Sequence, residues 1–494
     1  MKNSKKTLLQ KALILGLAAF AITFQSCKKS FLNVDPAQNT AATQFFKTQD
    51  DATKAVNAMY ANLHEYNNIA FPPIAIESVG SDDAEKGSSP TDATYMNSYD
   101  NFTVTAGEGQ LQGFWKGMYQ TINFSNQILT NVPGITMDEA LKTRYLAEAK
   151  FIRAYCYFRL VRAYGDVPLR LTLPKNATEY NLPRTPKAQV WAAIETDLTD
   201  AASVLPQTYG SADVGRITKG AALSLHAKVA LYQKKWTDVI TYTTQVMGLG
   251  YSLYPDYEQM FRTTHKNNQE SIFEIQCNIV PNNPDASNSQ YSQVQGVRGS
   301  TGGGWGFNVP TADLAAAYEP GDPRRNATII FRGETTPEGD VIPADGDNPM
   351  YNQKSYVPFS LYVSGFNEGA QQNKIVIRYA DVLLMNAEAN NELGNTAAAL
   401  GPLEQVRARA RGSNAAILPK VTSTDQAVVR TAIYKERRVE FAMEFDRYFD
   451  VIRQGRGTEV FGPRGWKAGK NEVWPVPQNE IDISGGALTQ NPGY

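Results

Sequence analysis

The chain has 494 residues, and its 48 basic and 49 acidic side chains leave a formal net charge of −1. This balance gives no reason to expect nucleic acid or an anionic membrane surface as a partner. Three scattered histidines do not supply a metal site, and we expect no metal and no cofactor.

The N-terminus has the features of a lipoprotein signal peptide. Lysines at positions 2, 5, 6 and 11 precede an apolar run, Ala12–Phe24, which is too short to span a bilayer as a stable helix. Cys27 directly follows this run and is typical of a bacterial lipobox, in which the cysteine sulfur is lipidated. The sequence predicts a signal peptide over 1–26 and a lipid-anchored chain from Cys27. Ordinary secretion with Cys27 incidental is the alternative.

Helical periodicity dominates much of the remaining chain. Blocks with apolar residues at helical spacing cover 48–66, 114–129, 137–164, 190–205, 219–247 and 378–410. In the third block the apolar residues cover more than half of the circumference, so this helix is expected to pack on more than one side, as in a superhelical stack. Cys156, within that block, and Cys277 are expected to be buried small hydrophobes.

Two of these blocks resemble tetratricopeptide units, which are pairs of antiparallel helices. In 219–247, small residues precede Tyr232 and Trp236 near the turn, and in 378–410 Gly394 makes the turn. The alternative is two unrelated helical hairpins.

The amino-acid composition changes between Tyr251 and Val376, where Gly, Asn, Pro and Ser separate short apolar segments that we predict to be strands, such as 271–276 and 327–331. A segment of this length without helical periodicity, inside a helical chain, more often forms a binding surface than a mere connection. We therefore expect this region to contribute to function.

Most catalytic signatures are absent from the sequence. There is no HExxH or CxxC pair, no GxSxG elbow and no Walker loop. Asp82 and Asp83 are paired carboxylates of the kind that a glycosidase uses, but adjacent loop residues rarely face each other across a bond, so a solvated or hydrogen-bonding pair is favoured. The acidic segment 340–347 lacks the bidentate acid of a full calcium loop. No catalytic residue is predicted.

Aromatic side chains beside acids and amides remain as candidates for ligand binding. A sugar stacks its apolar C–H face on an aromatic ring and offers its hydroxyls to fixed hydrogen-bond partners. The alternative is that these rings only anchor loops. The predicted ligand-binding residues are Asp82, Asp83, Tyr95, Tyr99, Tyr291, Trp305 and Phe307.

Several motifs together identify a resemblance. They are the lipobox followed by "FLNVDP", "LAEAKFIRAYCYFRLVRAYGDVPL", "RYADVLLMNAEA", "IYKERRVEFAMEFDRYFDVIRQGR" and the terminal "PVPQNEIDISGGALTQNPGY". In these motifs the chain resembles the SusD/RagB family of Bacteroidetes outer-membrane lipoproteins nearly from end to end.

The resemblance implies a mainly α fold, in which a tetratricopeptide-like superhelix of helical hairpins packs against a loop-rich, short-stranded ligand-binding region. It implies a single domain over 27–494 with a loop-rich insertion at about 251–376. It also implies a non-enzymatic, surface-exposed outer-membrane lipoprotein that delivers extracellular nutrient to a SusC-like TonB-dependent transporter. Glycan is the commonest ligand of the family. The resemblance places the ligand site in two regions of this chain, 82–99 and 291–307, without assigning individual residues.

Alternatives to this function remain open. The chain could instead bind a non-glycan ligand such as a peptide, or act as a lipid-anchored scaffold that binds only protein partners. A glycoside hydrolase using Asp82 or Asp83 is the least favoured.

Two of the motifs predict structure in more detail. The charged residues of 435–456 are spaced for i,i+3 and i,i+4 pairing along a helix, and such a network would fix helix orientation. The C-terminal stretch 475–494 is predicted to be an extended segment packed back on the body.

Overall fold

The computed structural model describes residues 45–284, 289–299 and 303–494. The chain divides into two compact units, Met1–Lys47 and Thr48–Tyr494, and the fold described below is that of the second unit. Cys27 and the predicted signal peptide lie outside the described residues. No helix in the described part of the chain combines the length and hydropathy needed to cross a membrane.

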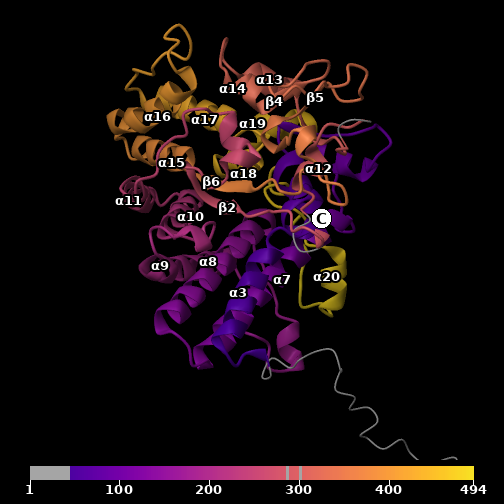
Figure 1. Ribbon diagram of the computed structural model, residues 1–494, viewed down its shortest axis with the longest axis vertical. Coiled ribbons are helices and arrows are strands. Elements are labelled where there is room, and N and C mark those ends of the chain that lie inside the picture. The colour runs from indigo at the N-terminus through magenta and orange to yellow at the C-terminus, as the bar shows by residue number, and fades with distance from the viewer. Residues whose placement is uncertain (1–44, 285–288, 300–302) are drawn as a thin grey trace, which may run out of the picture. The chain divides into compact units, whose positions relative to one another are not determined.

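The fold is mostly helical, as predicted, and its long helices stack side by side (Figure 1). Helix α7 packs on α8, α8 on α9, α10 on both α9 and α11, and α15 on both α11 and α16. The long helices are α3 (Gln49–Asn62), α7 (Gly109–Asn131), α8 (Glu139–Tyr164), α9 (Lys187–Val204), α10 (Lys219–Tyr232), α11 (Trp236–Met247), α15 (Tyr379–Glu392), α16 (Thr396–Arg411) and α17 (Gln426–Phe441).

Shorter helices lie mainly in the connections. They are α4 (Tyr66–Ile69), α5 (Phe71–Ile74), α6 (Asn97–Asp100), α12 (Tyr291–Gln295), α13 (Ala312–Ala317), α14 (Arg324–Thr328), α18 (Arg447–Arg453), α19 (Gly457–Phe461) and α20 (Gln478–Ile483).

Helix α8 shows how local sequence defines an element. It begins after Asp138, whose carboxylate accepts a hydrogen bond from the backbone N–H of Leu141 at 2.8 Å, and it ends at Gly165, whose φ of 72° favours glycine. Most of its length is buried on all sides, as its apolar circumference predicted. The predicted turn at Gly394, with φ of 81°, separates α15 from α16 in the same way.

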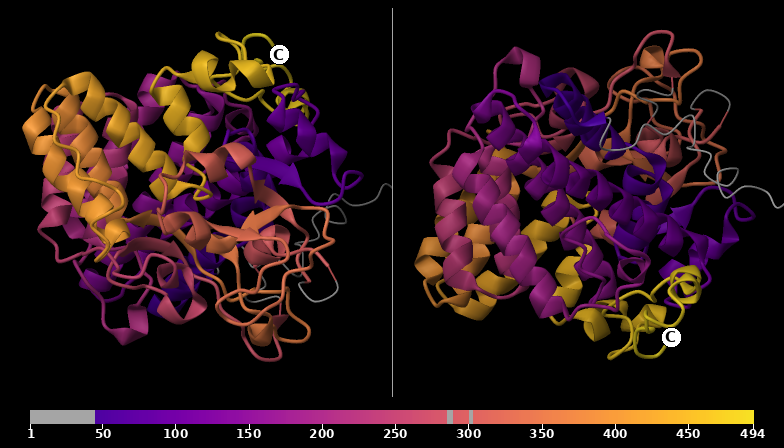
Figure 2. Two further views of the ribbon diagram at one scale, coloured as in Figure 1. Left: turned by 90° about the horizontal axis from the view of Figure 1, so that it is seen from above. Right: turned by 90° about the horizontal axis from the view of Figure 1, so that it is seen from below.

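Strands form three two-stranded antiparallel sheets: β1 (Ala84–Gly87) with β3 (Phe307–Pro310), β2 (Ser271–Ile275) with β6 (Lys374–Arg378), and β4 (Ile329–Phe331) with β5 (Met350–Asn352). The strand predicted at 271–276 is therefore confirmed, and so is the one predicted at 327–331 for its last three residues, since Ala327 and Thr328 belong to α14. Seen from above, the 251–376 region lies beside the orange and yellow helices that follow it in the chain (Figure 2).

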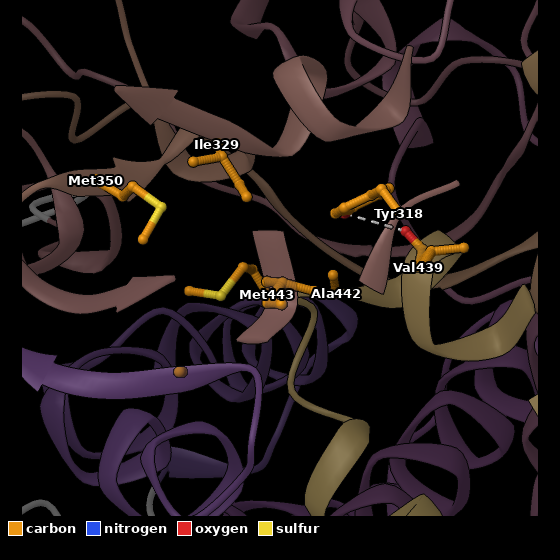
Figure 3. Close-up of a cluster of buried hydrophobic side chains, with 8 residues drawn as sticks. Tyr318, Ile329, Met350, Val439, Ala442 and Met443 are labelled. Carbon is orange, nitrogen blue, oxygen red and sulfur yellow. Dashed lines mark hydrogen bonds between the residues drawn. The ribbon is translucent and has the colours of Figure 1, made fainter. Parts of the chain in front are cut away.

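A separate apolar cluster holds this loop-rich region against α17 (Figure 3). Tyr318, Ile329 and Met350 come from the region, and Val439 and Met443 come from α17 and the turn after it. The buried hydroxyl of Tyr318 donates to the backbone carbonyl of Val439 at 3.3 Å. Because these side chains exclude water, the short strands gain support that two-stranded sheets alone do not provide.

Charge pairing in 435–456 differs from the predicted pattern. The segment is broken into α17 and α18 at Met443 and Phe445, which have φ of 66° and 74°. The acids therefore pair mainly with distant elements: Glu440, fully buried, binds Arg324 at 2.8 Å, Arg378 at 2.5 Å and also Arg409. Pairing along one helix holds for Asp450 and Arg453, which lie 2.7 Å apart in α18, but not for the acids of α17, because the helix is interrupted inside the motif.

The C-terminal stretch packs back on the body, but it is not extended throughout. The backbone N–H of Trp474 donates to the carbonyl of Ala163 at 2.7 Å, and the amide of Asn491 donates to the carbonyl of Tyr164 at 3.0 Å. Between these anchors Gln478–Ile483 forms α20, which corrects the prediction for that part. Cys156 and Cys277 are buried and free, as expected of small hydrophobes.

Candidate ligand-binding site

The β1–β3 ladder joins the two regions that sequence reasoning assigned to a ligand. Gly87 pairs with Phe307 at one end of the ladder, and Ala84 pairs with Pro310 at the other. Just beyond the first end, the backbone N–H of Ser88 donates to the carbonyl of Gly306 at 2.6 Å. The loop after β1 and the loop before β3 therefore lie side by side.

Lys86 organises the loop after β1. Its ammonium donates to the backbone carbonyls of Gly87, Ser89 and Asp92 at 2.8, 2.8 and 2.9 Å, so the loop curls around a single charge. Arg298 then joins this loop to the other one, because its guanidinium lies 2.6 Å from the Asp92 carboxylate and also donates to the carbonyl of Trp305 at 3.3 Å.

Close backbone contact shapes the loop before β3. A Cβ on Gly304 would lie 2.3 Å from the carbonyl carbon of Gly296, so only glycine fits there. Next to this contact, the backbone N–H of Trp305 donates to the carbonyl of Gln293 at 2.8 Å. The close packing of Gly304 on Gly296 thus places Trp305 in a defined position.

Three partly exposed aromatic side chains belong to this part of the fold, and we call them the aromatic surface: Tyr66 and Tyr95, which lie close enough to interact electrostatically, and Trp305, which contacts Phe71 of α5. Tyr66 is 36% exposed, Tyr95 is 44% exposed, and Trp305 is half-buried. The buried ring of Phe71 supports Trp305 from below, with ring centroids 6.5 Å apart, and Phe307 packs against Phe71 at 4.7 Å.

The hydroxyls of this surface are neutral hydrogen-bonding groups at physiological pH. Burial, and then the proximity of Tyr95, raises the pKa of Tyr66 to about 12. The hydroxyl of Tyr95 accepts a hydrogen bond from the side-chain amide of Gln110 at 3.1 Å, which orients it. Neutral hydroxyls beside flat rings suit the alternating polar and apolar faces of a sugar.

The other predicted rings lie inside the protein. Tyr99 is fully buried against Trp474, with ring centroids 5.3 Å apart, and its hydroxyl donates to Glu108. Tyr291 is 6% exposed and meets Phe445 edge to face at 6.3 Å. The structure thus brings Tyr95 and Trp305 to the surface, keeps Phe307 beneath them, and uses Tyr99 and Tyr291 in the interior.

Asp82 and Asp83 directly precede β1, five and four residues before Gly87, or roughly 13–17 Å along an extended chain. Both oxygens of Asp82 accept from Arg447, at 2.8 and 2.7 Å, and Asp83 accepts from Arg438 at 2.8 Å. Burial raises the pKa of Asp82, but the guanidinium of Arg447 outweighs it, so the pKa lies below its ordinary value. Both acids hold β1 against α17 and α18.

Sequence reasoning missed Tyr66 and Arg298. Tyr66 was assigned to the end of a helix over 48–66, but α3 ends at Asn62 and Tyr66 begins a separate short helix before Pro72 and Pro73. Those two prolines mark the start of α5, and no comparable signal marks the break at 63–65 before Tyr66. Arg298 had no local signal, because its partner Asp92 is remote in sequence.

Metal binding has no support in the described residues, where no group of three or more histidine, cysteine or acidic side chains is placed to hold an ion. In the acidic segment 340–347, Asp340 accepts hydrogen bonds from the hydroxyl of Tyr356 and from the backbone of Phe359.

Comparison with known proteins covers both parts of this site. A family model described as "SusD family" matches residues 269–494, and one described as "Starch-binding associating with outer membrane" matches residues 30–231. SusD-like protein P2 of Formosa agariphila is 28% identical over 497 residues, which cover 96% of this chain and 98% of that protein.

Solved structures agree with the fold. A structure titled "Laminarin binding SusD-like protein" is 30% identical, covers 91% of this chain and 100% of its own, and superposes with a TM-score of 0.80. Surface glycan-binding protein A from Bacteroides thetaiotaomicron, solved in complex with laminarihexaose, superposes with a TM-score of 0.75 over 90% of this chain and 100% of its own. At 24% identity the latter likeness concerns the fold alone.

Proposed function

This chain belongs to the SusD family, and from that premise we propose that it binds extracellular oligosaccharide at the aromatic surface without altering it chemically. The observation that most supports this function is the pair of accessible rings, Tyr95 and Trp305. They follow two loops whose bases lie side by side at the end of the β1–β3 ladder and are joined by the Arg298–Asp92 ion pair. A SusD-like protein of known structure that is 30% identical to this chain is described as laminarin-binding. A β-glucan is therefore the first ligand to test.

We also propose that the chain is anchored to the outer membrane through lipid on Cys27 and delivers its ligand to a SusC-like TonB-dependent transporter. The outer-membrane description of the family match over 30–231 supports the location. The anchor rests on the lipobox in the sequence. Mass spectrometry of the mature N-terminus should find a lipidated Cys27, and an unmodified terminus beyond it would contradict the anchor.

A non-catalytic role fits the state of the two acids that a hydrolase would need. Both oxygens of Asp82 are bound by Arg447, and Asp83 accepts from Arg438 and is 2% exposed, so neither carboxylate is placed to attack or protonate a glycosidic bond. Incubation with laminarin should release no reducing sugar.

The binding test uses calorimetry on the soluble mature chain with laminarihexaose and with a starch-derived hexaose. Trp305→Ala should weaken binding of the better ligand about fivefold or more, since a stacked ring contributes about 1 kcal/mol. Leu393→Ala, an exposed apolar change at the end of α15, serves as the matched control and should leave affinity unchanged.

Full affinity in a variant that lacks both Tyr95 and Trp305 would overturn the site. Absence of binding to every glycan tested, together with a stable complex with an outer-membrane protein, would favour the scaffold alternative instead.

A further inference from the structure

Helix α7 separates two different surfaces. On one face, a Cβ at Gly117 would lie 2.6 Å from the side-chain oxygen of Asn68, so this face packs directly on α4 and α5, which contribute Tyr66 and Phe71. Trp115 and Tyr119 lie two residues to either side of Gly117, about 200° around the helix, and so point to the opposite face. What lies there is separate from the aromatic surface.

A cavity of about 580 Å³ lies against that opposite face, and we call it the α7–α20 pocket. Its walls are α7, the segment 168–182, and the C-terminal stretch with α20, which runs beside α7 (Figure 1). Its apolar lining includes Trp115, Tyr119, Tyr180, Ile483 and Leu488. The volume falls within the range of ligand sites, which are typically 300–1,000 Å³ and mostly apolar with a few placed polar groups.

Hydrogen bonds hold each wall in place. The hydroxyl of Tyr119 donates to the carbonyl of Pro168 at 2.7 Å, and the amide of Asn126 donates to the carbonyl of Arg170 at 3.0 Å. On the other side, the amide of Asn479 donates to the side chain of Gln112 at 2.6 Å. Because both walls are tied to α7, the pocket exists before a ligand arrives, which lowers the entropic cost of binding.

The rim exposes large apolar side chains. Tyr180 is 60% exposed and Ile483 is 72% exposed, and they belong to different walls of the same pocket. Exposed apolar groups that converge on one cavity are typical of a binding site, whereas scattered ones need no explanation.

The polar lining indicates the chemistry of the ligand. Lys116, Arg170 and Glu480 are the charged residues of the lining, and the Arg170 guanidinium is held by the backbone carbonyls of Glu179 and Tyr180. Burial raises the pKa of Glu480, which accepts a hydrogen bond from the indole of Trp115. Gln120 and Asn123 are exposed, and within the described ranges their side chains have no hydrogen-bond partner. Unpaired amides, a carboxylate and aromatic rings together match the hydroxyls and C–H faces of an uncharged sugar.

We propose that the α7–α20 pocket is a second sugar-binding site, which takes one or two residues of a neutral oligosaccharide independently of the aromatic surface. This proposal rests on the proposed function, because it supposes that the chain meets glycan at all. Tyr180 supplies the stacking ring, and Asn123 and Gln120 bind hydroxyls. A chain with two separate sites holds a long polymer at two points, so the apparent affinity for polymer exceeds that for a short oligosaccharide.

The test measures stoichiometry and affinity by calorimetry with laminarihexaose and maltohexaose. The wild-type chain should bind two equivalents of at least one probe, and Trp305→Ala/Tyr95→Ala should still bind one. Adding Tyr180→Ala/Asn123→Ala to that variant should weaken the remaining binding at least fivefold. Gln245→Ala/Leu393→Ala, two exposed changes away from both sites, serves as the matched control and should leave it within twofold.

Three results would separate this proposal from the proposed function. If the wild type binds a probe and Trp305→Ala/Tyr95→Ala binds neither, the second site is overturned and the first stands. If adding the pocket substitutions to Trp305→Ala/Tyr95→Ala changes its affinity by less than twofold, the pocket is excluded as the second site. If the pocket substitutions remove all binding and the ring substitutions remove none, the second site stands and the aromatic surface fails. A wild type that binds neither probe contradicts both.

Discussion

The helical scaffold and the aromatic surface use charge in opposite ways. In the scaffold, Glu440 and Arg378 are essentially excluded from water and bind several partners each. At the aromatic surface, Arg298 and Asp92 form one pair that is 37% and 36% exposed. Buried ions depend on every partner, whereas exposed pairs contribute little to stability. Stability should therefore be sensitive to single changes in the scaffold, and the surface should tolerate changes that alter binding.

The largest expected effect is at Glu440. Glu440→Gln removes the charge that faces the guanidiniums of Arg324, Arg378 and Arg409, and it should lower the free energy of unfolding by about 3–5 kcal/mol. Urea unfolding measures this. Glu459→Gln, which affects an exposed pair with Arg456, should cost less than about 1 kcal/mol. Equal losses in the two variants would remove the contrast between buried and exposed ion pairs.

A pH dependence should identify a second buried pair in the scaffold. Burial raises the pKa of Glu77, but Arg159, which binds both its oxygens at 2.9 and 2.7 Å, outweighs burial and lowers the pKa from 4.5 to about 2. Because the folded pKa is below the unfolded one, ionised Glu77 stabilises the protein above pH 4.5, and this stabilisation is lost as the pH falls toward 2.

The total contribution is about 3 kcal/mol, of which roughly 1 kcal/mol should be lost between pH 6 and pH 3.5. Glu77→Gln should be less stable than the wild type at pH 6, and its stability should fall less steeply as the pH is lowered. Urea unfolding of both proteins at several pH values measures the difference in slope. Identical slopes would show that Glu77 is not held ionised in this way.

A smaller effect is expected where the scaffold supports the ligand loops. At Gly87, with φ of 68°, a Cβ would lie 2.5 Å from the carbonyl oxygen of Gly306. Gly87→Ala should therefore lower the free energy of unfolding by about 1–3 kcal/mol and also weaken glycan binding. Gly107→Ala meets no atom within 4 Å and should change neither quantity much. Normal binding by Gly87→Ala would mean that the β1–β3 ladder does not position Trp305.

The scaffold could be predicted from the sequence much further than the site. Helical periodicity and the turn glycine Gly394 are local signals, so most of the long helices were located correctly. Breaks made by left-handed residues such as Met443 have no such signal, because methionine does not favour that conformation. The exposure of a ring depends on packing between remote segments, so Tyr95 and Tyr99 were indistinguishable in sequence and Tyr66 was missed.

Tyr95 and Tyr99 offer the finest test of the comparison, because they are the same residue four positions apart. Tyr99→Phe removes a buried hydroxyl that donates to Glu108, and it should cost about 1 kcal/mol of stability. Glu108 keeps its hydrogen bond from the backbone of Gln110 at 3.0 Å, which caps α7 and limits the loss. Tyr95→Phe removes only an exposed hydroxyl and should cost less than about 0.5 kcal/mol.

Binding should show the reverse order, because only Tyr95 presents its ring to solvent. Tyr95→Ala should weaken affinity for laminarihexaose, whereas Tyr99→Phe should leave it unchanged in the folded fraction. Unfolding and calorimetry on the same preparations measure both quantities. The opposite result, in which Tyr99→Phe weakened binding and Tyr95→Ala did not, would show that this assignment is wrong. Burial would then not distinguish the ligand-binding tyrosine from the structural one.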